Sequence, residues 1–590
     1  MSFSALIIGH DTLALNCARM LREADHEIRA IVTRHAAFRD WAGAEGIACK
    51  TPGEALEGGS ADWLLSIANL DIIPDAVLGL ARKGAVNFHD GPLPRYAGLN
   101  APVWALLDGE PRHGITWHRI AGGVDEGNIL VQKTFDIAPN ETALSLNTKC
   151  FAAAMESFPD VIEALAGDAA EGRKQDLSER SYYGRHDRPV SMGALEFANN
   201  TSKLLRIVHA LDHGDYWNPL TCPKLDAGEA VLLISGAAPA EGSDDAGRVL
   251  EVEKTSATIA TRDGAIRLTG LRAADGGPVD AREILAQGQV LGTPTPPDPD
   301  FAQRAAKADP FWRARLLAMP DQAPPFQPAA APEPCEAVLS LPSGMDLDEV
   351  RGRLAALAAR MGLTHLALGT LDIAPGYLCR WLPLTIHADG TLEEAAAALV
   401  EEIGLALEKG PHAADLPARM QAPRACPPIA VSSDGDPVPG AALSLSADCT
   451  RLIGDTALVS QADIDLFAAR LVHVLNMRAE TEIASLDILP EAERRDLLEA
   501  RNATDTEVDP TCIHTAFEAQ AARTPAAEAL IYEGERLTYA ALNARANQVA
   551  HVLRGMGAGP GGFVGLYMRR SAELLIGALA IQKAGAAYVP

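Results

Sequence analysis

Apolar residues near the start of the chain occur in two alternating patterns. Short continuous runs predict buried strands. Between them, apolar residues recur every three or four positions, as Leu13, Cys17 and Leu21 do, which predicts an amphipathic helix. Strands that alternate with helices indicate a Rossmann-like, doubly wound parallel sheet, whose ligands lie at the carboxyl ends of the strands. We expect a helix over 74–83 and strands over 4–9, 27–33, 62–69 and 84–89.

The pattern changes after this first domain, which we place at 1–200. Its last elements are an alternating strand over 128–137 and a helix over 143–165. Short β-rich segments separated by Gly and Asp turns then follow. They predict a small β-barrel-like (OB-like) domain over 201–290.

Proline accumulates beyond this β-rich part, at TPTPPDPD and at APPFQPAAAPEP, and such stretches predict extended linkers. An α+β region follows, with alanine-rich amphipathic helices over 349–361 and 392–408. The expected fold class is therefore multidomain α/β. After residue 290 we expect linkers over 291–335 and the α+β region over 336–508. The start of a further α/β domain is expected over 509–590.

The formal net charge of -27 disfavours nucleic acid and anionic membrane as partners, because both require a basic footprint. No run of apolar residues reaches the roughly 18 to 20 that span a bilayer, and the N-terminus lacks the features of a signal peptide. The nine cysteines form no CxxC or CxxH pair, so we expect free thiols, no metal site and a cytoplasmic location.

The most informative stretch is NFHDGPLPRYAGLNAPVWALLDGEPRHGITWHRIAGGVDEGNIL, residues 87–130. Asn87 and His89 are two residues apart at a predicted strand end, so both side chains can point into one cleft. An amide donor beside an imidazole suits acyl transfer, because the amide stabilises an oxyanion and the imidazole moves a proton near neutral pH. Asp125 could orient the histidine from a loop. Close approach of a flat ligand is allowed by Gly91, Gly98, Gly122, Gly123 and Gly127.

Taken singly, each of these residues has a structural explanation. An Asn or His at a strand end more often caps a turn or satisfies backbone groups, and Asp125 alone fits a turn. We interpret His118, in the predicted strand GITWHRI, as a packing residue or as one that supports the site from behind, and we assign His113 no role.

In combination these residues make the chain resemble the formyltransferases that use 10-formyltetrahydrofolate, a family that includes methionyl-tRNA and sugar formyltransferases. The resemblance covers roughly 1–290. It is carried by Asn87-x-His89, by LPRYAG at 93–98 and by DEGNI at 125–129. It implies an enzyme of the one-carbon transferase class in which Asn87, His89 and Asp125 are catalytic. By segment, it implies folate contacts at Ser66, Ile67, Asn69, Ile72, Pro74, Leu93, Gly122, Gly123 and Val124.

The motif departs from part of that family, because many relatives have Ser where this chain has Gly91 or Pro92. The HDGPLP version looks more like the sugar and peptide-synthetase branches than the tRNA branch. The region 205–290 holds few lysines, which also disfavours tRNA. The first strand–helix turn, GHDTLA, lacks GxGxxG, so we expect no nicotinamide dinucleotide site.

Residues 511–590 resemble the start of a nonribosomal peptide synthetase adenylation domain. That family's phosphate loop and catalytic lysine come later, so we expect no adenylation by this sequence and interpret it as a fragment of a longer protein. PFWRARLLAMP and LLEARNATDTEV resemble segments of condensation domains, but HHxxxDG is absent from the sequence. We therefore expect a degenerate, inactive condensation-like region or a structural linker domain, in which His387 and His412 are packed or solvated.

The leading hypothesis is a formylation domain at the start of nonribosomal peptide synthesis, in secondary metabolite production. The formyl donor would be 10-formyltetrahydrofolate and the acceptor an aminoacyl group on the phosphopantetheine arm of a carrier protein, with downstream synthetase domains as partners. One alternative is formylation of a free amine, such as an amino sugar or a hydroxyornithine-like amino acid. The other is an inactive scaffold that docks synthetase partners, which the intact Asn87, His89 and Asp125 disfavour.

Overall fold

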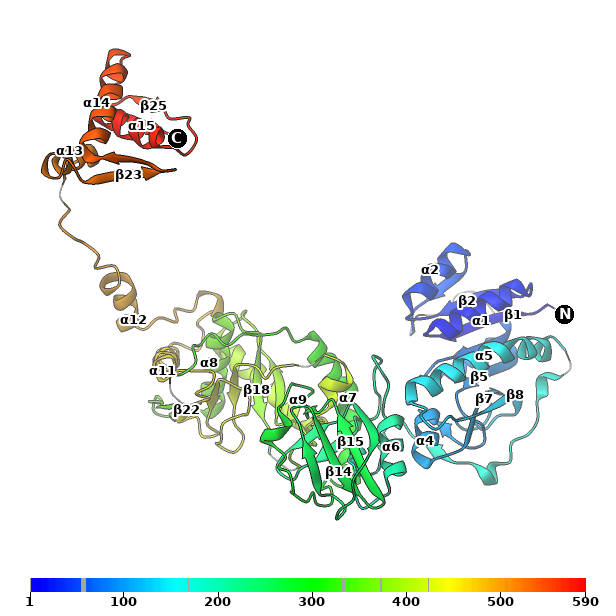
Figure 1. The fold of residues 1–590 in the computed structure, drawn as a ribbon. Helices are drawn as coiled ribbons and strands as arrows, with labels where there is room; N and C mark the ends of the chain where they lie inside the picture. The colour runs from blue at the N-terminus through cyan, green and yellow to red at the C-terminus, as the bar shows by residue number, and fades with distance from the viewer. Residues whose placement is uncertain are drawn as a thin grey trace. The chain divides into compact units, whose positions relative to one another are not determined.

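The computed structural model describes residues 2–52, 54, 60–167, 169–330, 335–371, 374–422, 424–508 and 510–590. The chain forms two compact units, Met1–Pro490 and Glu491–Pro590 (Figure 1). The end of the second predicted proline-rich linker, 331–334, lies outside the described residues.

A seven-stranded sheet in the order β3-β2-β1-β4-β5-β7-β8 forms the centre of the first domain. From β3 to β5 all neighbours are parallel, whereas β7 is antiparallel to β5 and β8 antiparallel to β7. The expected parallel sheet is present from β3 to β5, and β7 and β8 extend it as antiparallel strands. The loop 120–128 joins β7 to β8, and a connection this short links antiparallel rather than parallel neighbours. The sheet elements are β1 Ser4–Gly9, β2 Glu27–Val32, β3 Ala48–Lys50, β4 Ala61–Ile67, β5 Ala81–His89, β7 Arg112–Arg119 and β8 Ile129–Asp136.

The helices of this domain cover a sheet that is apolar on both faces. In β1, Ala5 and Ile7 belong to one apolar cluster and Leu6 and Ile8 to another, because successive side chains point to opposite faces. On one side α1 and α5 contact each other, and α5 starts with a capping box at Thr142. The helices are α1 Thr12–Glu23, α2 Ala36–Ala44, α3 Asp75–Leu78, α4 Ala101–Asp108 and α5 Ala143–Ala166.

The predicted strands and the helix over 143–165 are confirmed, but the helix expected over 74–83 is wrong beyond Leu78. That helix ends at Gly79, and β5 begins at Ala81. Ala81 pairs with Ala61 and Gly84 with Trp63 on β4. This pairing overrides the local preference of the sequence, because strand formation depends on neighbouring strands more than on intrinsic propensity.

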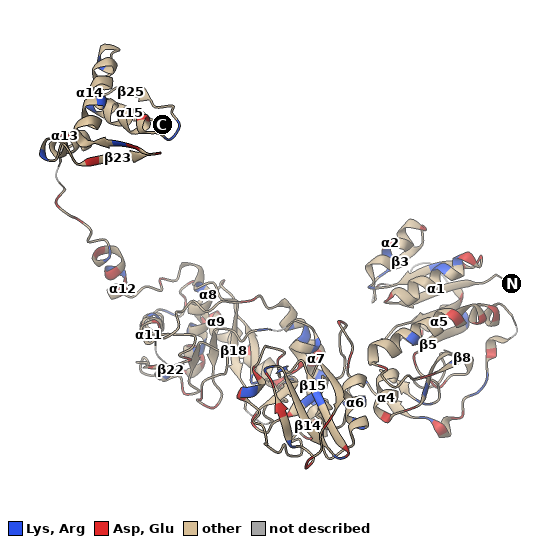
Figure 2. Ribbon diagram, in the orientation of Figure 1, with Lys and Arg blue, Asp and Glu red and all other residues tan. Residues whose placement is uncertain are grey.

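The β-rich domain that follows contains two sheets packed around one apolar core, with strand orders β10-β11-β16 and β12-β15-β14-β13. Its predicted strands are confirmed, while a closed OB-like barrel stays a prediction. Acidic and basic residues are interspersed along this part of the ribbon (Figure 2). The elements are α6 Thr201–Ala210, β10 Lys224–Asp226, β11 Val231–Leu233, β12 Gly236–Ala240, β13 Val249–Val252, β14 Ser256–Thr261, β15 Gly264–Thr269 and β16 Arg272–Ala273. Two short strands of the first domain, β6 Ala97–Gly98 and β9 Tyr182–Tyr183, pair with each other.

The segment expected to be an extended linker contains a long helix, α7 Pro299–Ala318. Asp298 caps it, and Pro299 occupies the first turn, where proline is tolerated because the amide there has no helical partner. Trp312 and Leu316 are fully buried in the core of the following region. Because these side chains are buried, residues 299–318 of the predicted linker form a helix that packs against the following region.

That following region is a six-stranded sheet in the order β17-β22-β21-β20-β18-β19, covered by helices that share its core. The helices α8 and α9 pack closely because Gly352 has no side chain; a Cβ there would lie 2.4 Å from Ala396 Cα. Its condensation-like character stays a prediction. The elements are β17 Cys335–Val338, α8 Leu347–Arg360, β18 His365–Gly369, β19 Trp381–Thr385, α9 Leu392–Lys409, α10 Leu416–Arg419, β20 Ile429–Val431, β21 Leu443–Leu445, β22 Arg451–Gly454 and α11 Gln461–Leu475.

The second unit begins with α12 and a single π turn and then forms a small α/β fold with its own apolar cluster. Among the helices of the described ranges, none combines the length and the apolar character needed to cross a membrane. The elements are α12 Glu491–Arg495, α13 Ile513–Arg523, β23 Glu528–Tyr532, β24 Glu535–Thr538, α14 Tyr539–Gly555, β25 Phe563–Gly565, α15 Ala572–Lys583 and β26 Ala587–Val589.

Candidate functional site

Asn87 and His89 lie at the carboxyl end of β5, where the sheet changes from parallel to antiparallel neighbours. They are two residues apart on one strand, so their side chains point to the same face. Asn87 pairs with Ser66 on β4 and with His118 on β7. The register thus places His118 beside Asn87.

Asp125 reaches this strand end from the loop between β7 and β8. It adopts a φ of 58°, a left-handed conformation that aspartate tolerates better than most residues. The loop is tight at Gly127, where a Cβ would lie 1.8 Å from Arg119 O. Gln175 holds the loop by donating to Asp125 O at 2.8 Å and to Gly127 O at 2.6 Å. Backbone constraints therefore aim the carboxylate.

His118 joins two of the three residues predicted to be catalytic, Asn87 and Asp125. His118 Nε2 lies 3.3 Å from Asn87 Nδ2 and 3.3 Å from Asp125 Oδ1. Its Nδ1 lies 2.8 Å from Arg119 O, which can only accept, so Nδ1 carries a proton. With Nε2 unprotonated, the ring accepts from the Asn87 amide; with Nε2 protonated, it donates to Asp125. His118 thus connects the side chains of Asn87 and Asp125.

His89 is oriented by a backbone carbonyl rather than by Asp125 alone. Its Nε2 lies 2.7 Å from Tyr96 O, so Nε2 carries a proton in the neutral ring and Nδ1 does not. Nδ1 lies 3.6 Å from Asp125 Oδ2 and 3.8 Å from Asp90 Oδ1, which is ion-pair rather than hydrogen-bond range. The unprotonated nitrogen therefore faces carboxylates that would stabilise an imidazolium.

Asp125 remains ionised although only 10% of its side chain is exposed. Burial by itself would raise the pKa of this carboxyl. The hydrogen bond from His118, the nearby charges of His89 and His118 and the Gly98 N–H at 2.8 Å outweigh burial and lower the pKa to about 2. A permanent negative charge thus lies beside two imidazoles.

Two contributors to this arrangement were not identified from the sequence. The sequence indicates His118 only as a packing residue or as one that supports the site from behind, and it does not indicate the Tyr96 carbonyl. The sequence places His118 on the predicted strand GITWHRI, but the pairing of that strand with the one that carries Asn87 is visible only in the structure. A backbone carbonyl such as Tyr96 O leaves no mark in residue types, so nothing in the sequence indicated it.

The residues predicted to contact folate lie on segments near this cluster, in different environments. Ser66 and Asn69 bond each other at 3.4 Å at the end of β4, and Ile72 is 87% exposed in the loop that follows. The side chains of Ile67 and Leu93 are buried, so only their backbone could contact a ligand. The remaining predicted contacts are exposed, at Pro74, Gly122, Gly123 and Val124.

The other histidines considered from the sequence lie outside the cluster. His113 is buried, and burial lowers its pKa to about 4 despite a contact with Asp90 O at 2.8 Å. His412 is buried, with Nδ1 2.8 Å from Ala413 O, and His387 is exposed. All nine cysteines are free thiols.

Comparison with protein families divides the chain into three matched segments. Residues 18–162 match the family "Formyl transferase" and residues 190–289 match "Formyl transferase, C-terminal domain". Residues 517–590 match "AMP-binding enzyme".

Curated relatives are large peptide synthetases. Tyrocidine synthase 3 of Brevibacillus parabrevis is 42% identical over 141 residues, which are 23% of this chain and 2% of that protein. Bacitracin synthase 3 of Bacillus licheniformis is 37% identical over 153 residues, which are 26% of this chain and 2% of that protein. The chain therefore spans only a few per cent of the length of these relatives.

Solved structures with a similar chain trace include WlaRD and HypX. WlaRD, a sugar 3N-formyl transferase, is 19% identical with a TM-score of 0.37, covering 46% of this chain and 98% of that one. HypX from Aquifex aeolicus is 19% identical with a TM-score of 0.36, covering 48% of this chain and 47% of that one. Scores this low carry no conclusion about this chain.

Proposed function

We propose, from the premise that residues 18–162 and 190–289 are the two domains of a formyl transferase joined to peptide-synthetase sequence, that this enzyme starts nonribosomal peptide synthesis by formylation. The formyl donor is 10-formyltetrahydrofolate. The acceptor is the amino group of an aminoacyl thioester on a carrier protein. The observation that carries the proposal is the cluster of Asn87, His89, His118 and Asp125 at a strand end inside the first formyl transferase domain.

The surroundings of the cluster fit a flat folate donor. The loops on either side expose apolar side chains, with Leu70 66%, Ile72 87% and Val124 47% exposed. The glycines of the Asp125 loop leave room for close approach of a ring. When bound there, the folate supplies the formyl carbon.

His89 would manage the proton of the acceptor amine. As the amine nitrogen bonds to the formyl carbon, it loses a proton to His89 Nδ1, the unprotonated ring nitrogen. Asp125, ionised and 3.6 Å away, stabilises the imidazolium. The proton then goes to the nitrogen that leaves the formyl carbon, so His89 returns to its starting state.

Asn87 would stabilise the charge that develops on the formyl oxygen. Its amide is a preorganised N–H donor and is partly exposed, so it is accessible to substrate. His118 holds that amide from behind at 3.3 Å. Donors of this kind contribute roughly 3 to 4 kcal/mol to the barrier of acyl transfer.

A carrier-bound acceptor is favoured by the sequence that follows the formyl transferase. The AMP-binding match and the synthetase relatives indicate a setting in which amino acids are carried as thioesters. The net charge of -27 argues against tRNA, which needs a basic surface.

The test is formyl transfer by the full chain, with 10-formyltetrahydrofolate as donor and intact mass as readout. An aminoacyl carrier protein and the free amino acid are offered side by side, with His89→Ala as the control. One added formyl mass on the carrier, absent with the variant, supports the proposal. A formyl mass gained by the free amino acid alone would mean that formylation precedes loading of the amino acid onto the carrier protein. No gain on either, with folate still bound in calorimetry, indicates a binding scaffold.

A further inference from the structure

The short strand β6 contacts both groups that manage the proton. Tyr96, the residue before it, accepts from His89 Nε2 through its carbonyl at 2.7 Å. Gly98 donates its N–H to Asp125 Oδ2 at 2.8 Å. The position of this backbone therefore sets the orientation of both side chains.

β6 is held in place by residues 180–188, which we call the strap. Ala97 N donates to Ser181 O at 3.0 Å and Leu99 N donates to Tyr183 O at 2.9 Å. The Tyr183 ring lies between Trp104, at 4.4 Å, and Tyr96, at 5.9 Å between ring centres, and is nearly parallel to both. The strap thus acts as the only neighbouring strand of β6 within the described residues.

The strap also contacts the two loops that flank the cluster. Arg180 donates to Val124 O at 3.0 Å, one residue before Asp125. Arg185 donates to Leu70 O and lies 3.8 Å from the Asp71 carboxylate, in the loop after β4. Movement of the strap would therefore displace β6 and both loops together.

At its far end the strap is anchored by charge. Arg188 Nη2 donates to Asp309 Oδ2 on α7 at 3.0 Å, and both side chains are less than a tenth exposed. Asp309 Oδ2 also accepts from Arg419 Nη2 at 2.9 Å. Arg419 lies 3.1 Å from Asp415 Oδ1, and Asp415 Oδ2 lies 2.6 Å from Lys224 Nζ. We call these five residues the ion chain.

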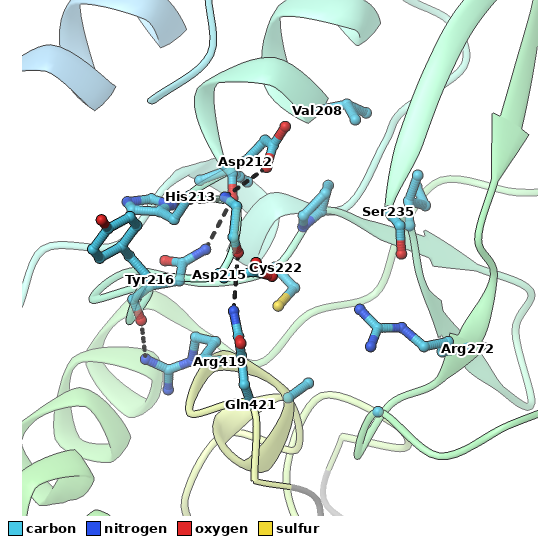
Figure 3. Close-up of a pocket in the computed structure, with 17 residues that line it drawn as sticks. Val208, Asp212, His213, Asp215, Tyr216, Cys222, Ser235, Arg272, Arg419 and Gln421 are labelled. Carbon is cyan, nitrogen blue, oxygen red and sulfur yellow. Dashed lines mark hydrogen bonds between the residues drawn. The ribbon is translucent and has the colours of Figure 1, made fainter. Parts of the chain in front are cut away.

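The ion chain lies in a buried seam, the junction at which the strap, the β-rich domain, α7 and α10 meet. Arg419, Asp415 and Lys224 are fully buried, and buried charges require closely defined partners. Figure 3 shows the edge of this seam, where Gln421 donates to Gly214 O at 3.0 Å beside a cavity of about 350 Å³. An apolar cluster spans the same junction. Its members include Met192 from the segment after the strap, Val231 from the β-rich domain, Ala302 and Ala305 from α7, and Tyr377 from the region beyond α7.

We propose that Arg188 and Asp309 are positioning residues for formyl transfer: the ion chain holds the strap, and through β6 the strap orients His89 and Asp125. The α7 helix and the condensation-like region are then part of the support of the active site. The role in catalysis rests on the proposed function. Neither residue touches the reacting groups; each acts through the backbone of residues 96–98.

Small displacements at this site should have measurable effects, because misplacement of catalytic groups by 1 Å lowers rates about a hundredfold. Removing the Arg188 charge leaves Asp309 paired with Arg419, so the seam keeps its other contacts while the strap loses its anchor. The expected consequence is a loose strap in a folded protein.

The test compares Arg188→Met with Arg353→Met in the full chain. Arg353 is a matched control: it is 6% exposed and donates to Val474 O at 3.0 Å and Met477 O at 2.9 Å, away from the strap. Below the melting transition of every variant, we expect Arg188→Met to lower kcat about tenfold or more and Arg353→Met to change it less than about twofold. Arg188→Lys, which keeps the charge, should recover most of the loss. Equal losses in the two Met variants would overturn the proposal.

A second readout does not depend on catalysis. Hydrogen exchange should be faster in Arg188→Met at the Gly98 amide and in peptides covering 180–188, and unchanged there in Arg353→Met. Unchanged exchange in Arg188→Met would overturn the positioning role even if kcat fell. If the unmodified chain transferred no formyl group to any acceptor, the proposed function would fail, while the exchange result would still decide whether the ion chain holds the strap.

Discussion

At the scale of single residues, proton positions determine which groups can act. Tyr96 O and Arg119 O are pure acceptors, and each fixes one N–H of a neighbouring histidine. His89 is left with a free nitrogen toward Asp125, and His118 with a nitrogen shared between Asn87 and Asp125. Which ring nitrogen of each neutral histidine carries the proton therefore follows from backbone carbonyls rather than from residue type.

The first prediction concerns His89. Under the proposed function, replacing it by alanine removes the proton acceptor, and we expect kcat for formyl transfer to fall by a factor of roughly 100 to 10,000. Steady-state rates with the donor at saturation measure this. His551→Ala, an exposed histidine of the second unit, is the control and should leave the rate unchanged. A similar rate in His89→Ala would mean that another group takes the proton.

The second prediction concerns the pH dependence of stability. The pKa of Asp125 is about 2 in the folded protein and near 3.8 when unfolded, so the unfolded chain binds the proton more readily. Its ionised form therefore stabilises the fold by roughly 2 kcal/mol above pH 4, and this contribution is lost as the pH falls toward 2. The denaturant midpoints of the protein and of Asp125→Asn should differ at pH 6, and this difference should shrink steadily as the pH falls from 4 toward 2. A difference between the two midpoints that stays constant with pH would contradict the lowered pKa of Asp125.

At the scale of elements, close backbone approaches decide where the site is assembled. Gly127 lets the β7–β8 loop pass Arg119 O, and Gly98 lets β6 pass Tyr183 O, where a Cβ would lie 2.0 Å away. Both contacts join elements that carry or support Asp125. The glycines of the motif thus shape the protein's own backbone contacts, in addition to the approach of a ligand expected from the sequence.

The third prediction follows from Gly127. In Gly127→Ala the new Cβ would lie 1.8 Å from Arg119 O, so the loop must shift. We expect a loss of about 1–3 kcal/mol in the free energy of unfolding and a larger fractional loss of formyl transfer. Gly43→Ala, at a helical position with nothing within 4 Å, is the matched control and should be neutral or slightly stabilising. Equal stability of the two variants would argue against the tight loop.

At the scale of the whole unit, the formyl transferase domains and the region after them share buried charges. Asp415 accepts from Lys224 Nζ, from Thr221 Oγ1 at 2.7 Å and from Cys222 N at 2.8 Å. Burial by itself would raise the Asp415 pKa, but the charges of Lys224 and Arg419 hold it well below its usual range. In a protein that ends at residue 290, Lys224 would therefore lack the carboxylate of Asp415 that pairs with it.

The fourth prediction tests this junction. Asp415→Asn removes the charge that balances Lys224 and Arg419, and we expect a loss of roughly 3–5 kcal/mol in stability because two buried cations lose a partner. Chemical denaturation of the full chain, followed by a signal from unit Met1–Pro490, measures it. Glu253→Gln, which breaks an exposed pair with Arg267 at 2.7 Å, should lose far less stability. Similar losses would show that the buried pair contributes no more than a surface one.

The sequence by itself determined the elements whose signal is local. The apolar run at β1, the Asn87-x-His89 spacing and the DEGNI segment are all readable from neighbouring residues, because strand periodicity and loop chemistry act over a few positions. Only the tertiary structure decided that β7 and β8 run antiparallel, that α7 is a helix and that His118 lies between Asn87 and Asp125. It also decided that Lys224 meets Asp415, 191 residues away. Such contacts depend on which surfaces are buried together in the folded chain. Neighbouring residues along the sequence carry no local signal for them.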